Sequence, residues 1–214
     1  FEAEAAPLIR RTLDLDRFVV ARDTTDGALV GVAGSFALTL TVPGGAQLDA
    51  PGVTWVSVAP SHRRLGVLRT MMDELHSRYR TAGNAVAILT ASEGTIYERF
   101  GYGVATHIDE VTIARRTARL RAPLPGPLRT RITEASAARG AVEDLYRRWH
   151  AATPGSASAE QFWELFHADP EWARWGGSAR RLLLHPDGYV TYRVDEKDRA
   201  QLDGVKALTD EAAA

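Results

Sequence analysis

Apolar and polar positions in the first part of the chain alternate as they do in sheet strands. After a helical tail and a short strand, the pattern predicts a turn at TTDG and a long strand over residues 28–42, in which Gly31 and Gly34 suggest bulges. Two Pro-Gly signals predict a loop over residues 43–52. Residues 53–58 are apolar at nearly every position, which is typical of a strand buried on both faces of a sheet.

The period then becomes helical over residues 65–82. One helical face is apolar, and its members are Leu68, Met71, Met72, Leu75 and Tyr79. Gly83 supplies a C-terminal stop. A buried strand at AVAILTA, a short helix at SEGTIYERFG and strand material over residues 102–114 follow. This order predicts an α/β fold of the α+β type, with a mixed sheet and a parallel crossover around the helix.

Residues 115–128 contain three prolines and break the periodicity, which predicts a linker between residues 1–114 and residues 129–214. The second segment predicts a strand, a helix over residues 137–150, a tryptophan-rich helical stretch and two strands joined by a PDG turn. Its order resembles that of the first segment, so we expect a duplicated fold of which the second copy is partial.

Composition limits the function. The 214 residues carry 26 Lys+Arg against 27 Asp+Glu, for a net charge of −1, which does not point to nucleic acid or an anionic membrane. The absence of cysteine excludes disulfides, thiolate zinc sites and cysteine nucleophiles within these residues. No apolar run approaches the ~20 residues of a membrane span, and a cytoplasmic protein is the default expectation. The chain starts at Phe1 and stops at a polar helical stub, so we expect a piece of something longer.

The sequence HRRLG, residues 62–66, stands between the strand and the helix, and we call it the arginine turn. A helix start has unpaired N–H groups and a partial positive charge, and Gly66 allows close backbone approach. With Arg63 and Arg64 these features form a cradle for phosphate or pyrophosphate. The alternative is a solvated helix start. His62 could cap the helix, touch a phosphate or be an exposed loop residue.

Other chemistry finds little support. The six histidines form no H-E-x-x-H or paired set, so we predict no metal site, and no G-x-S-x-G elbow is present. Trp163, Trp172 and Trp175, with Phe162 and Phe166, form either the core of the second domain or a wall of a pocket between the domains. The acids of residues 14–17 and 109–110 could attract a cation, or lie on solvated faces.

The arginine turn after VSVAP resembles the acetyl-CoA motif R/Q-x-x-G-x-G/A of the GNAT N-acetyltransferases, with Leu68 where many members have Gly or Ala. Together with ASEGTIYERFGYGVAT downstream, it is similar in particular to the Eis (enhanced intracellular survival) family. The resemblance covers residues 19–113 and continues more weakly to the C-terminal stub. It implies a GNAT fold followed by the start of a second GNAT-like domain, with acetyl-CoA as the cosubstrate.

The resemblance also implies roles. Residues 56–58 would pair with the pantetheine arm as another strand does, residues 64–69 would wrap the pyrophosphate, and the SE pair would lie at the far part of the site. The implied cofactor-binding residues are Val56, Ser57, Val58, Arg63, Arg64, Leu65, Gly66, Val67, Leu68, Arg69, Ser92 and Glu93. Tyr97 would be the general acid, since a phenol can protonate a leaving thiolate. Tyr102 competes for that role, or it packs in the core or forms a pocket wall.

In the family the general base is the C-terminal carboxylate of a sterol-carrier-like domain, which is not among these residues, and nothing supports Ala214 in that role. The implied acceptors are aminoglycosides, polyamines or lysine side chains, attacked directly in a ternary complex. A hexamer is implied, and some members are secreted. The alternative is a non-catalytic GNAT scaffold that binds CoA or a partner protein.

Overall fold

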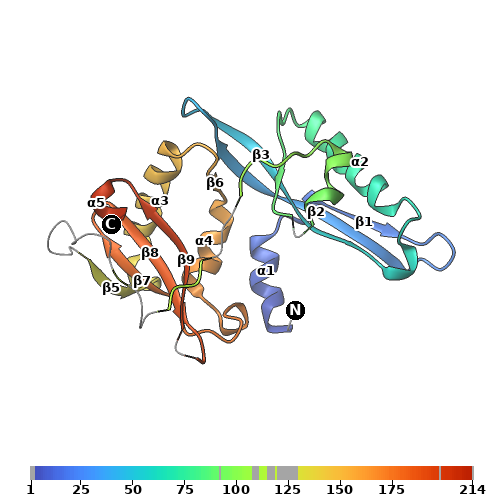
Figure 1. The fold of residues 1–214 in the computed structure, drawn as a ribbon. Coiled ribbons are helices and arrows are strands. Elements are labelled where there is room, and N and C mark those ends of the chain that lie inside the picture. Colours follow the sequence, from blue (N-terminus) through green and yellow to red (C-terminus); the bar gives the residue numbers. More distant parts are fainter. Residues whose placement is uncertain are drawn as a thin grey trace. The chain divides into compact units, whose positions relative to one another are not determined.

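The computed structural model describes residues 3–91, 93–107, 111–114, 119, 130–197 and 199–213. The chain forms two compact units (Figure 1). The first comprises Phe1–Val104 with Thr153–Phe162, and the second comprises Ala105–Ala152 with Trp163–Ala214. Residues 153–162, which the sequence assigns to the second segment, therefore belong to the first unit.

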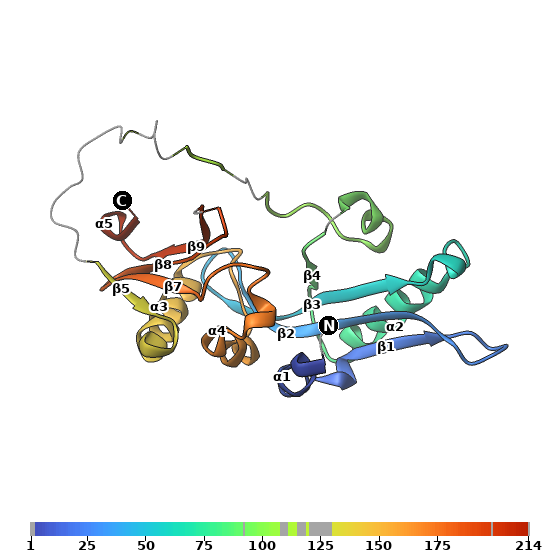
Figure 2. The ribbon, with the colours of Figure 1, turned by 90° about the horizontal axis from the view of Figure 1, so that it is seen from below.

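The first unit is a mixed sheet with a crossover helix. Its sheet follows the order β1 (Phe18–Arg22), β2 (Leu29–Thr41), β3 (Gln47–Val58) and β4 (Ile88–Leu89), and β6 (Ala157–Ser158) also pairs with β2. Neighbours among the first three strands are antiparallel, whereas β3 and β4 are parallel. Helix α2 (Val67–Thr81) makes the crossover between them, as predicted, and α1 (Ala6–Thr12) precedes the sheet (Figure 2).

Helix α2 packs the predicted apolar face against the sheet. Met72 and Leu75 are fully buried, and Met71 and Tyr79 are nearly so. Each such side chain contributes about 1.5–3 kcal/mol when buried. The helix ends at Gly83, whose φ of 77° is left-handed. There the amide of Asn84 donates to the carbonyl of Tyr79 at 2.9 Å, which confirms the predicted stop.

The second predicted bulge, at Gly34, coincides with a close contact between β1 and β2. The register of β2 against β3 shifts between Val32 and Gly34. A Cβ atom at Gly34 would lie 2.2 Å from Cδ1 of Phe18, so the ring of Phe18 occupies the space that a side chain would need. A glycine at this position lets the ring pack flat against the strand.

Several predictions in the first unit were wrong. Strand β3 begins at Gln47, because residues 47–52 pair with β2 despite their Pro-Gly signals. The predicted helix at residues 92–101 is instead two 3₁₀ turns, Gly94–Ile96 and Glu98–Phe100. The predicted strand over residues 102–114 is absent from its described part, residues 102–107 and 111–114, where the chain finds no strand partner. Strand β4 is also shorter than the predicted AVAILTA strand.

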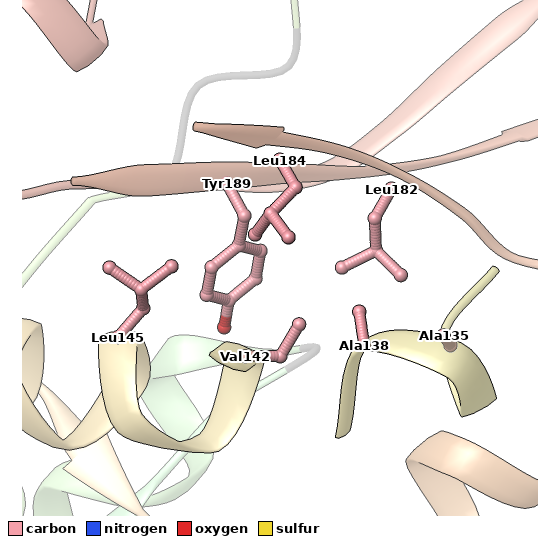
Figure 3. Packing of buried hydrophobic residues seen from close by; sticks show 7 residues of the cluster. All are labelled: Ala135, Ala138, Val142, Leu145, Leu182, Leu184 and Tyr189. Carbon is pink, nitrogen blue, oxygen red and sulfur yellow. The ribbon is translucent and has the colours of Figure 1, made fainter. Parts of the chain in front are cut away.

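The second unit is an antiparallel sheet with helices. Its strand order is β5 (Arg131–Glu134), β7 (Arg181–His185), β8 (Gly188–Val194) and β9 (Ala200–Ala207), of which β9 was not predicted. Helices α3 (Arg139–Ala152), α4 (Trp163–Ala168) and α5 (Asp210–Ala213) belong to the same unit. Strand β6, which lies between α3 and α4 in sequence, belongs to the first unit. Figure 3 shows Leu182, Leu184 and Tyr189 facing Val142 and Leu145 across the core.

The tryptophan-rich stretch is only partly core. Trp163 and Phe166 pack against the core of the second unit, as expected. Trp175, however, is 94% exposed, because it lies beyond α4 on a loop rather than on a helical face. Phe162 contacts Phe36 within the first unit, with ring centroids 4.6 Å apart. No helix in the described part of the chain is long and apolar enough to cross a membrane.

Candidate active site

The end of β3 presents an open strand edge. On one side Ser57 and Val58 pair with β2, at Val32 and Gly31. On the other side β4 pairs with β3 only at Gly52 and Val53, so the described chain offers no strand partner beyond that point. Trp55 has a φ of 53°, which is a strained value for a tryptophan and lies where the two strands part. Residues 56–58 thus have backbone groups available for a strand-like ligand.

A cavity of about 820 Å³ lies in the first unit beside this edge. The predicted site residues that line it are Val56, Ser57, Val58, Arg63, Arg64, Gly66, Val67, Leu68, Arg69, Glu93 and Tyr97. Leu65 does not line it and is 69% exposed, because the turn directs it outward. Ser92 and the acids at 109–110 lie outside the described residues.

The lining includes residues that sequence reasoning did not place in the site. These are His62, Ile96, Arg99 and Phe100. His62 was considered for it, but the other three follow from the two 3₁₀ turns, which bring Ile96, Tyr97, Arg99 and Phe100 to the same wall. A single helix was expected there, and its spacing would also have placed Ile96, Arg99 and Phe100 near one face. The signal for Arg99 and Phe100 was their proximity to Tyr97 in the sequence.

The arginine turn has an unusual backbone. A 3₁₀ turn, Pro60–His62, precedes it, and α2 begins at Val67 rather than at the predicted Leu65. Gly66 is the N-cap, with φ 86° and no side-chain cap, and Arg64 also has a left-handed φ of 64°. The first amides of α2 therefore lack intrahelical acceptors and lie at the positive end of the helix dipole.

Cations gather at this helix start. Arg63, Arg64, Arg69 and Arg99 all line the cavity, and no ion pair involves any of them within the described parts of the chain. The guanidinium groups of Arg69 and Arg99 lie 5.9 and 5.4 Å from the ring centre of Phe100. Positive side chains beside a positive helix end repel one another unless an anion lies between them, so the arrangement fits a polyanionic ligand.

Tyr97 also lines the cavity, and its side chain is an uncharged phenol rather than an ion. Burial raises the pKa of its hydroxyl above the usual 10.0, so the group keeps its proton at neutral pH. Its ring meets Tyr102 edge to face, with centroids 6.1 Å apart. Tyr102 does not line the cavity, and its hydroxyl lies 3.1 Å from Nε2 of His76. Of the two phenols, Tyr97 is therefore the one available to a ligand.

Comparison with known proteins agrees with this geometry. Residues 2–105 match the family model described as an acetyltransferase (GNAT) domain, which gives the fold its class. N-acetyltransferase Eis of Mycobacterium bovis (strain BCG / Pasteur 1173P2) is 41% identical over 218 residues, covering 98% of this chain and 54% of that protein. An uncharacterised N-acetyltransferase of Streptomyces coelicolor is 42% identical over 201 residues, covering 90% of this chain and 49% of its own.

A solved structure gives the same result. The crystal structure of Eis1 from Mycobacterium abscessus superposes with a TM-score of 0.74 at 31% identity, covering 95% of this chain and 53% of that one. The chain belongs to the Eis family of GNAT N-acetyltransferases. It spans about half the length of the curated relatives it matches.

Proposed function

We propose that the protein transfers an acetyl group from acetyl-CoA to the amino group of a cationic acceptor. The observation that supports this most is the meeting, around one cavity, of an open strand edge, an arginine-rich helix start and a protonated phenol. The donor fits these residues because its phosphates match the cations of the arginine turn and its amide-containing arm matches the strand edge. When bound, acetyl-CoA supplies a thioester with a reactive carbonyl carbon.

The chain's residues would act in three ways. Val56, Ser57 and Val58 would hold the extended arm through their backbone groups, and Arg63, Arg64 and Arg69 would bind phosphate oxygens with the first amides of α2. Tyr97 would hold a proton and give it to the sulfur as the carbon–sulfur bond breaks. The attacking amine forms the new carbon–nitrogen bond and loses a proton. The family resemblance implies a direct transfer, and these 214 residues contain no cysteine for a thiol-based acyl intermediate.

The acceptor and its base belong to the part of the proposal taken from the family. Aminoglycosides, polyamines and lysine side chains are the acceptor classes to test. The base would be a carboxylate beyond residue 214, in the sterol-carrier-like domain that the resemblance implies. A second GNAT-like domain over residues 129–214, a hexamer and a cytoplasmic location stay predictions of the same origin.

The test is a thiol-release assay on the full-length protein with acetyl-CoA and a panel of such amines. A Tyr97→Phe variant should lower kcat by about 100-fold, the usual contribution of a positioned acid, and leave CoA affinity unchanged. Tyr192→Phe, at a half-buried tyrosine of β8 in the second unit, serves as the matched control. If CoA binds but no amine yields thiol, the non-catalytic scaffold is the better description. Unchanged turnover in Tyr97→Phe would remove this residue from its role.

A further inference from the structure

A cluster of polar side chains joins the arginine turn to the far end of the first hairpin. His62 places Nε2 2.9 Å from Oδ2 of Asp23, and its Nδ1 2.9 Å from Oγ of Ser61. Asp23 comes directly after β1, in the turn that leads to β2, and lies 39 residues from His62 in sequence. The side chains of His62 and Asp23 are only 25% and 24% exposed. Neither resemblance nor periodicity pointed to this contact.

Asp23 is itself held in place. Its Oδ1 accepts hydrogen bonds from the amide of Thr25 at 2.7 Å and from the Thr25 hydroxyl at 2.6 Å. Its backbone amide donates to the carbonyl of Ala28, and its carbonyl accepts from the amide of Gly27, both at 2.9 Å. These Thr25 bonds and the nearby His62 lower the pKa of Asp23 to about 2, so it is a carboxylate at any pH near neutrality. The Asp23 carboxylate is thus held in a fixed position just after the end of β1.

The arginine turn needs such a fixed point. Arg64 and Gly66 both have left-handed φ angles, and the helix that follows has no side-chain cap. Strained backbone persists only where the surroundings over-determine it. Before the turn, the amide of His62 bonds the carbonyl of Ala59 at 2.9 Å, while the Arg63 amide makes a longer bond of 3.4 Å to Pro60. His62 is therefore the last well-anchored residue before the arginines.

We propose that Asp23 and His62 are a positioning pair, which fixes the arginine turn so that Arg63, Arg64 and the amides of α2 meet the phosphates of the donor together. This inference rests on the proposed function and deepens it. Both ring nitrogens of His62 already have partners, Asp23 and Ser61, so His62 acts on the turn rather than by binding a phosphate. Loss of the pair would disorder the binding turn and leave the chemistry at Tyr97 unchanged.

The experiment compares Asp23→Asn and His62→Ala with the unaltered full-length protein. Calorimetric titration with CoA gives Kd, and steady-state assays give kcat and KM for acetyl-CoA. Each variant should bind CoA roughly tenfold more weakly, the scale on which lost preorganisation acts, with kcat at saturation unchanged. His62→Gln, whose amide can still donate to Asp23, should recover part of the loss. The double variant should be no worse than either single one, because both break the same contact.

Asp26→Asn is the matched control. Asp26 lies in the same turn, where its Oδ1 accepts from the amide of Ala28 at 2.9 Å, but it does not touch the arginine turn. Thr25→Val is a milder variant, should Asp23→Asn fold poorly: it removes the hydroxyl bond to Asp23 and keeps both the Asp23 charge and the amide bond. If Asp23→Asn and Thr25→Val bind CoA as well as Asp26→Asn does, or if the effects of Asp23 and His62 simply add, the pair has no positioning role. If the unaltered protein itself does not bind CoA, the proposed function fails instead.

Discussion

Arg64 offers a perturbation in which stability and binding should change in opposite directions. Its φ of 64° places a side chain in the left-handed region, which costs about 1–2 kcal/mol. Glycine adopts this region freely, but it adds about 0.5–1 kcal/mol of unfolded-state entropy. Arg64→Gly should therefore be more stable than Arg64→Ala, which retains the Cβ strain, by up to about 1 kcal/mol. In the first unit, of about 114 residues, that corresponds to an apparent melting temperature up to roughly 4 °C higher.

Binding should respond to the lost charge alone. A hydrogen bond to a charged group is worth about 1.5–3 kcal/mol, and the exposed position of Arg64 favours the lower end of that range. Both variants should then bind CoA about 10-fold more weakly. Arg63→Ala, at a residue with an ordinary φ of −65°, should lose CoA affinity to a similar degree, and Arg63→Gly should gain no stability over it from relief of backbone strain.

The assays are thermal melting without ligand and calorimetric titration with CoA at low and at high salt. The loss of affinity should be larger at low salt, since salt screens exposed charges. The reasoning is refuted if Arg64→Gly melts below Arg64→Ala, because the left-handed backbone would then impose no strain. It is equally refuted if Arg64→Ala binds CoA as tightly as the unaltered protein, because the arginine would then not face the anion.

Two further predictions concern groups away from the arginine turn. Burial lowers the pKa of His76 below its ordinary 6.5, so the unfolded chain takes up this proton more readily than the folded one. The contribution of His76 to stability should therefore be complete above pH 6.5 and should fall as the pH drops below it. In thermal melts from about pH 7.5 to about pH 5, His76→Gln should reduce that pH dependence. In the second unit Asp169 pairs with Arg193, and both residues are less than 10% exposed. Asp169→Ala should therefore destabilise that unit by about 3 kcal/mol in denaturant titrations. Asp195→Ala removes a pair with the exposed Arg199 and two backbone hydrogen bonds in the turn after β8, so it should lower the midpoint less. A flat pH dependence or equal midpoints would contradict these two statements.

The sequence alone predicted the elements whose signals are local. The apolar face of α2, its stop at Gly83 and the long β2 strand all follow from periodicity and from one glycine, and the structure contains them. The arginine turn was also recognisable, because its glycine and arginines are adjacent in the chain. Its predicted neighbours from Val56 to Arg69 line one cavity for the same reason, with Leu65 as the exception.

What the sequence did not predict depends on partners distant in the chain. Residues 47–52 form a strand because β2 offers a ladder for them, which outweighs their turn propensity. Strand β9 exists because β8 lies beside it, although most of its own residues are exposed. The contact of His62 with Asp23 is invisible to periodicity, since each residue in isolation is typical of an exposed loop.

The two halves of the proposed site, one for the phosphates of the donor and one for the acceptor amine, differ in charge. The half that we propose for phosphate binding consists of β3, the arginine turn and the start of α2, which are continuous in sequence, and its arginines have no ion pair among the described residues. Repulsion between those cations and the helix dipole makes the empty turn less favourable than a neutral one, so a bound polyanion stabilises the fold as well as occupying the site. The acceptor half has no comparable set of acids around the same cavity, where Glu93 is the one carboxylate in the described lining. Among the described lining residues, a cationic amine therefore has Glu93 alone for direct electrostatic attraction.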